Sequence, residues 1–420
     1  MKLFQQMLVA SASIGLIAPI GVQANDINID GMNNYASSKS SSKKQQFNSK
    51  TFANELATVN EKIDGLETQL DEFEAGSFSD TTVMSQRVVF DLGAADYSKV
   101  MKDGLESAQF AYSYRMELNT SFTGDDNMYI RILSGNHGGW MKSTDHGGYL
   151  GSVGKGSNLQ VDKIWYSFPV GEYNTVWVGP KIENYYMHGA APSIYKPVTK
   201  QFALGGNGNA YGASTDTGAG WAYKADNGFA ISSNIGTKSK TTNGETGLLT
   251  DESKTSFATQ VGYTQPQYAV SAIVNLKYNG WADGYLHTAD ADSSVGTAKN
   301  HTAYGLRGWW RPEETGSATP SITVGYDTTE YEGSVRTSDM WFVGLQWQDL
   351  INADDKVGLA LAQPTKLDNE TKDPFAYELY YSFKANDSVT VTPTIFAGTD
   401  REGTDNVDIF GALVQTVFKF

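Results

Sequence analysis

The residues of this sequence best suited to chemistry are charged side chains set at alternate positions among apolar ones. Arg115 and Arg131 each stand between two apolar neighbours. In a strand, a side-chain period of two puts such cations on one face and the apolar residues on the other. A charged face that lines a water-filled passage attracts or repels ions. The pattern therefore points to ion handling.

The same alternation predicts a set of inward-facing, pore-lining residues: Arg87, Arg115, Arg131, Lys163, Glu117, Lys277, Arg307, Arg311, Glu378 and Lys384. Two interpretations stay open. In one, the cations form a field that sets selectivity. In the other, each cation only pairs with a lumenal carboxylate. Under the first, the three arginines of adjacent predicted strands add their potentials, and the passage prefers anions.

The longest predicted loop runs from Lys181 to Gly218 and contains aromatic residues with polar tips. Such side chains line a constriction or guide sugars, or equally they pack the loop against a wall. The run from Gly205 to Asn209 has no framing strand and helix, so it is no phosphate loop and is expected to let the loop fold tightly. The predicted constriction residues are Glu183, Tyr185, Tyr186, His188, Tyr195 and Lys196.

Metal and catalytic chemistry find little support in the sequence. His137, Asp145 and His146 share one glycine-rich loop, but their spacing matches no recognised ligand pattern. No nucleophile can be placed beside a histidine and an acid. We therefore expect no metal site, no cofactor and no enzyme activity.

Alternating segments recur along the chain from Phe78 onward and predict about sixteen strands, with edges uncertain by about two to four residues. The connections between them mostly alternate between short and long. An even strand number, with short turns at one end and long loops at the other, is typical of outer-membrane barrels, and a soluble β-sandwich has no reason to sort its loops in this way. The predicted strands are 84–92, 108–119, 128–134, 159–168, 173–180, 219–224, 228–236, 256–264, 268–279, 301–311, 320–327, 339–348, 356–363, 375–384, 388–398 and 407–420.

Composition agrees with this all-β class. The chain has 43 Gly, 23 Tyr, 19 Phe, 9 Trp and no Cys, and aromatic residues form girdles at both membrane interfaces of a barrel. Past residue 24 no apolar run approaches the roughly 18–20 residues of a membrane-spanning helix. A net charge of −15 disfavours nucleic-acid partners. We predict a transmembrane antiparallel β-barrel over 76–420.

The first residues predict export. Lys2 precedes a largely apolar stretch, and small residues stand at the end of the segment, so 1–24 reads as a signal peptide; the alternative is a membrane anchor. Residues 25–51 are polar and of low complexity, and we expect them to be disordered.

A heptad seam follows, and it predicts a periplasmic coiled coil over 52–75. Self-association is the preferred interpretation, because the apolar stripe is narrow and its flanks are charged. A helix folded against the protein's own surface is the alternative. The mixed core residues do not choose between dimer and trimer. The seam consists of Phe52, Leu56, Val59, Ile63, Leu66, Leu70 and Phe73.

Several stretches resemble the cyanobacterial outer-membrane porins of the iron uptake type, which are related to the carbohydrate-selective porin family. They include residues 304–312 (YGLRGWWRP), 343–349 (VGLQWQD) and 411–420 (GALVQTVFKF). The resemblance covers 76–420 and extends more weakly over 52–75. It implies a trimer and uptake of iron or carbohydrate. Such porins usually carry an S-layer-homology module, for which 25–51 is too short.

These observations predict an outer-membrane porin, a passive diffusion channel for small hydrophilic solutes and inorganic ions. The alternative is a structural protein that links the membrane to the cell wall through its coiled coil. A siderophore receptor is disfavoured, because it needs about 22 strands and a plug. Expected partners are outer-membrane lipid and lipopolysaccharide, the solutes, two further copies of the chain and peptidoglycan. The N-terminal segment and the C-terminus are expected in the periplasm.

Overall fold

The computed structural model describes most of the predicted barrel domain. The predicted signal peptide, polar segment and coiled coil lie outside the described residues, as do Asp145 and His146. The described residues are 81–98, 107–142, 148–151, 153–211, 216–238, 248, 250–281, 286–291, 293, 298–333, 337–403 and 407–420.

Sixteen antiparallel strands of the described chain form one closed barrel, which confirms the predicted fold class. Each predicted strand is present, and the main differences are that the strands predicted at 84–92, 320–327 and 356–363 extend four or five residues beyond their predicted C-terminal ends. The strands are β1 (Thr82–Tyr97), β2 (Gln109–Thr120), β3 (Asn127–Gly135), β4 (Gln160–Val170), β5 (Asn174–Ile182), β6 (Asp216–Lys224), β7 (Phe229–Thr237), β8 (Thr255–Thr264), β9 (Tyr268–Tyr278), β10 (Asn300–Trp310), β11 (Ser321–Tyr331), β12 (Thr337–Gln348), β13 (Lys356–Leu367), β14 (Phe375–Asn386), β15 (Val389–Thr399) and β16 (Ile409–Lys419).

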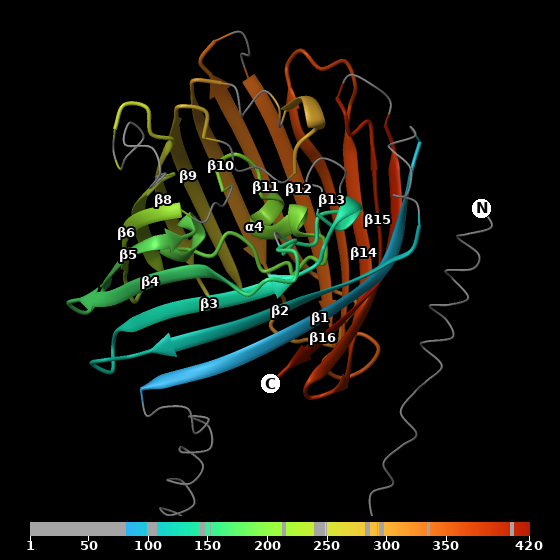
Figure 1. Ribbon diagram of the computed structural model, residues 1–420, viewed down its shortest axis with the longest axis horizontal. Coiled ribbons are helices and arrows are strands. Elements are labelled where there is room, and N and C mark those ends of the chain that lie inside the picture. The colour runs from blue at the N-terminus through green and yellow to red at the C-terminus, as the bar shows by residue number, and fades with distance from the viewer. Residues whose placement is uncertain are drawn as a thin grey trace, which may run out of the picture. The chain divides into compact units, whose positions relative to one another are not determined.

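The first and last strands close the barrel. β1 pairs with β16 from Arg87 opposite Lys419 to Tyr97 opposite Ile409, and Figure 1 shows the two side by side. Next to this ladder, the amide of Gln86 donates to the carbonyl of Phe420 across 2.8 Å. Closure matters because it leaves no strand edge whose N–H and C=O groups lack partners.

The connections differ between the two rims of the barrel. One rim carries the tight turns 171–173, 225–228, 265–267 and 387–388. The first strand, β1, begins at this rim, and the last strand, β16, ends there. The other rim carries most of the long loops, of which 183–215, between β5 and β6, is the longest. We call 183–215 the third loop. The sorting of loops predicted from the sequence is thus observed.

Exposure alternates along the strands as the period of two requires. On β9, Val270 and Val274 are exposed while Ser271 and Asn275 are buried, and β10 repeats the pattern with exposed Leu306 beside buried Arg307. The outer surface is therefore apolar, and the polar and charged side chains face inward.

The third loop folds into the barrel rather than away from it. It contains the short helices η2 (Asn184–Met187), η3 (Lys200–Phe202) and α4 (Ala203–Gly206), and the preceding long loop contains η1 (Gly139–Met141). η2 contacts β6 and β7, and α4 contacts β11 and β12, so the loop crosses the lumen (Figure 1). Among the described residues, no helix is long and apolar enough to cross a membrane.

The glycine-rich run of the third loop explains how it fits against the wall. Gly205 and Gly206 have φ values of 72° and 110°, a region that L-residues with a Cβ rarely adopt. A Cβ at Gly205 would lie 2.6 Å from Cδ of Arg307, and one at Gly206 would lie 2.5 Å from Cε of Met340. Glycine is required here for both conformation and space, so the expected tight folding of this run is observed.

Candidate functional site

The candidate site is the inner surface of the barrel together with the third loop. The charged residues of β1 to β4 that were predicted to face inward do lie on the strand face opposite the exposed apolar residues. The same holds for those of β9, β10 and β14. Their contacts, however, divide them into residues that meet water and residues that hold the third loop.

Most inward cations of the first strands are neutralised by carboxylates. Arg131 Nε donates to Asp162 Oδ2 across 2.7 Å, and Arg115 lies 3.4 Å from Glu117. A register shift between β3 and β4 leaves Asp162 without a partner in the ladder, which brings it to Arg131. Of the two interpretations left open by the sequence, pairing with a carboxylate is therefore the one observed for Arg115 and Arg131, because Glu117 and Asp162 offset their charges.

Lys163 is fully buried and does not line open water. Its ammonium forms an ion pair with Glu183 of the third loop and lies 5.6 and 5.2 Å from the ring centroids of Tyr185 and Tyr186. A buried ammonium needs such a carboxylate and such ring faces to offset its lost hydration. This corrects its assignment as a pore-lining residue: Lys163 holds the start of the third loop on the wall.

Glu378 is also fully buried, and it anchors the middle of the third loop. Its carboxylate accepts hydrogen bonds from Tyr195 Oη at 3.0 Å, from the Val198 amide at 3.2 Å, and from the amide and hydroxyl of Thr199, both at 2.6 Å. Glu378 is thus not pore-lining and Tyr195 not part of a free constriction surface, because each is buried against the other.

Arg307 anchors the glycine-rich run of the third loop to the barrel wall. It donates to Asp327 at 2.5 Å and to the carbonyl oxygen of Leu204 at 2.9 Å, and its guanidinium lies 4.5 Å from the ring centroid of Tyr211. Arg307 is 3% exposed, so its assignment to the open pore surface is corrected in the same way.

Two further predicted residues are buried. His188 of the third loop lies against β7, 3.4 Å from the amide nitrogen of Asn234, and is therefore not on a constriction surface. Lys277 is 1% exposed near the long-loop rim.

Two other residues singled out from the sequence have carboxylate partners. Lys384 lies at the tight-turn rim, where it pairs with Asp354 at 3.0 Å. His137 contacts Asp91 at 2.9 Å.

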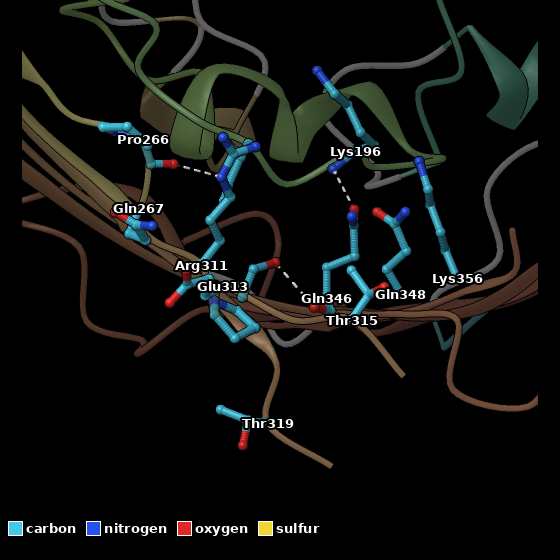
Figure 2. Close-up of a pocket in the computed structure, with 13 residues that line it drawn as sticks. Lys196, Pro266, Gln267, Arg311, Glu313, Thr315, Thr319, Gln346, Gln348 and Lys356 are labelled. Atoms are coloured by element: carbon cyan, nitrogen blue, oxygen red, sulfur yellow. Dashed lines mark hydrogen bonds between the residues drawn. The ribbon is translucent and has the colours of Figure 1, made fainter. Parts of the chain in front are cut away.

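Beneath the third loop, on the tight-turn side, the inner wall opens into a cavity of about 490 Å³. We call it the basin. Lys196 of the third loop, Arg311 after β10 and Lys356 at the start of β13 line it, with Gln346 and Gln348 between them (Figure 2). The sequence prediction included Lys196 and Arg311 but missed Lys356. Its signal was the inward alternation of Lys356 with Gly358 and Ala360 on β13.

Comparison with solved structures shows that the fold is that of porins. OprB of Pseudomonas putida matches with a TM-score of 0.59 at 12% identity, over 81% of this chain and 94% of that one. An anion-selective porin from Comamonas acidovorans matches with a TM-score of 0.53 at 9% identity, over 81% and 99%. A mutant porin of Rh. blastica gives 0.52 at 11% identity, over 81% and 100%.

Sequence comparison finds cyanobacterial relatives without an assigned function. An uncharacterized protein of Nostoc sp. (strain PCC 7120) is 24% identical over 88% of this chain and 70% of its own length. An uncharacterized protein of Synechocystis sp. (strain PCC 6803) is 29% identical over 30% of this chain and 24% of its own length. No protein-family model matches the chain.

Proposed function

We propose that this chain is an outer-membrane porin, a passive channel for small hydrophilic solutes and inorganic ions. The observation that carries the proposal is the closed barrel of sixteen strands with an apolar outer face and a charged inner face. The interior of a barrel of about eight strands is filled by its own side chains, whereas a barrel of sixteen strands encloses an aqueous lumen. The third loop narrows this lumen without being its wall.

The finer features of the proposal come from the sequence. Residues 1–24 direct export, 25–51 form a polar segment of low complexity, 52–75 a periplasmic coiled coil and 76–420 the barrel. Both ends of the barrel sheet lie at the tight-turn rim, which is the periplasmic rim of outer-membrane barrels. A homotrimer, and iron or carbohydrate as cargo, follow from the resemblance to cyanobacterial porins.

The test is single-channel recording of the purified full chain in a planar bilayer. Stepwise ohmic currents in potassium chloride are the expected result. Complete electrical silence of protein that migrates as a folded barrel would contradict the channel. It would favour the structural alternative, in which the coiled coil ties the membrane to the cell wall.

A further inference from the structure

The basin beneath the third loop differs in its charge balance from the parts of the described inner surface around Arg131, Lys163 and Arg307. Elsewhere Arg131, Lys163 and Arg307 each have a carboxylate partner. The basin is lined by three cations, Lys196, Arg311 and Lys356, and by one carboxylate, Glu313. Within the described chain, no ion pair joins any of these cations to a carboxylate. The basin therefore carries a local positive excess, although the protein is acidic overall.

The side chains around the basin are held in place by contacts that leave their donors available. Arg311 Nε donates to the carbonyl of Pro266 at 2.7 Å, which orients the guanidinium (Figure 2), and the terminal nitrogens of Arg311 have no acceptor among the described residues. The Lys196 amide donates to Gln346 Oε1 at 3.1 Å, and Tyr380 Oη donates to the same oxygen at 3.2 Å. Both donors fix the orientation of the Gln346 side chain, and its NH₂ group has no acceptor in the part of the chain that the structure describes.

The neutral lining adds further hydrogen-bonding groups. Gln267, Gln348, Thr315 and Thr319 border the same cavity. Figure 2 shows Arg311, Gln346, Gln348 and Lys356 on the same side of the strands, with Lys196 beside Gln346. The three cations come from three separate elements, so an ion in the basin is approached from several directions.

We propose that the basin is a binding subsite for oxyanions of the phosphate class, and that it makes the channel prefer anions. A guanidinium offers a planar fork that matches two oxygens of a phosphate, and lysines add point charges. Amide donors complete the shell of such an anion. The proposal rests on the proposed channel function and names the solute class that the channel favours.

The placement of the basin suits transport rather than tight capture. It is lined by residues that remain partly accessible to water, and Lys196 is exposed. A transport subsite must attract its ion and also release it. The basin lies next to the third loop, so its potential acts on ions that pass between this loop and the tight-turn rim.

The probe for the test is inorganic phosphate, added to single channels of the full chain that conduct chloride. We expect phosphate to reduce the chloride current in a saturable way. The variant Lys196→Gln/Arg311→Gln/Lys356→Gln should weaken this block by about tenfold or more, since one charge-assisted hydrogen bond alone accounts for roughly that factor. Its reversal potential in a salt gradient should move towards cations.

The matched control is the double variant Lys384→Gln/Asp354→Asn. Lys384 is an inward-facing lysine on the same rim whose charge is offset by Asp354, so this double variant removes a neutral pair and should leave the phosphate block unchanged. Heat-resistant migration of each variant checks the fold. Ohmic channels that phosphate does not block, or a triple variant blocked as strongly as wild type, would overturn the oxyanion subsite while the channel stands. Block by a neutral disaccharide instead of phosphate would also overturn it.

Discussion

Tyr195 Oη lies 3.0 Å from Glu378 Oε1 although the two residues are 183 positions apart in the chain. The contact joins the third loop to the inner face of β14, and both side chains are buried. It fixes the third loop to the inner face of the barrel wall. If the proposed channel function holds, we expect the conductance and the stability of the barrel to depend on this same carboxylate.

Glu378→Ala should loosen the third loop and destabilise the barrel by roughly 2–5 kcal/mol, because several buried donors lose a charged acceptor. We expect a larger and noisier single-channel conductance together with a lower unfolding temperature in detergent. Tyr195→Phe removes one hydrogen bond and should cost about 1 kcal/mol with little change in current. Equal conductance in wild type and Glu378→Ala would show that the loop is held by other contacts.

Arg131 and Asp162 should behave as a neutral unit in ion selectivity. Arg131→Gln leaves the Asp162 carboxylate unpaired, so the reversal potential in a salt gradient should shift towards cations, more strongly at low salt. The double variant Arg131→Gln/Asp162→Asn should return it close to the wild-type value. A double variant that stays as cation-selective as the single one would contradict this pairing. It would show that Arg131 contributes an unpaired positive charge, as in the interpretation in which the arginine potentials add.

Glu370 predicts a pH dependence of stability. It lies in the loop 368–374, where burial raises its pKa to about 7 and the Thr288 hydroxyl donates to it at 2.5 Å. An unfolded glutamate titrates near about 4.3. Between these two pH values the Glu370 carboxyl therefore keeps a proton in the folded state that it releases in the unfolded state. This contribution to stability is lost as the pH rises from about 4.3 to about 7.

Glu370→Gln mimics the protonated acid and should flatten this part of the curve of unfolding temperature against pH. Asp373→Asn is the control of opposite sign, since the hydrogen bond from Lys366 lowers the pKa of the exposed Asp373. An unchanged slope between pH 4 and pH 7 in Glu370→Gln would contradict the assignment.

The predicted coiled coil should support the oligomer. Replacing Ile63 and Leu66 with Asp puts charges into the apolar seam and should lower the temperature at which a trimer dissociates in detergent. The barrel should remain folded, because the seam lies outside it. Light scattering of the wild type tests the trimer itself: a monomer would refute it, whereas unchanged heat resistance of the variant would refute only the role of the seam.

The barrel could be predicted from the sequence because its cause is local. A side-chain period of two, repeated between turn residues, assigns each strand and its faces without knowledge of any distant residue. This is why sixteen strands, the sorting of long and short connections, and the inward direction of residues such as Arg115 and Arg307 were all available from the order of the amino acids.

Only the tertiary structure decided which inward residues meet water. That outcome depends on the path of the third loop, and the path depends on contacts such as Tyr195 with Glu378 and Leu204 with Arg307, whose partners are far apart in the chain. The loop covers Lys163, Arg307 and Glu378 and leaves Arg311 and Lys356 beside open space. The alternation of side chains predicts which face of a strand a residue lies on. It does not predict burial behind a folded loop, because that burial depends on contacts between residues far apart in the chain.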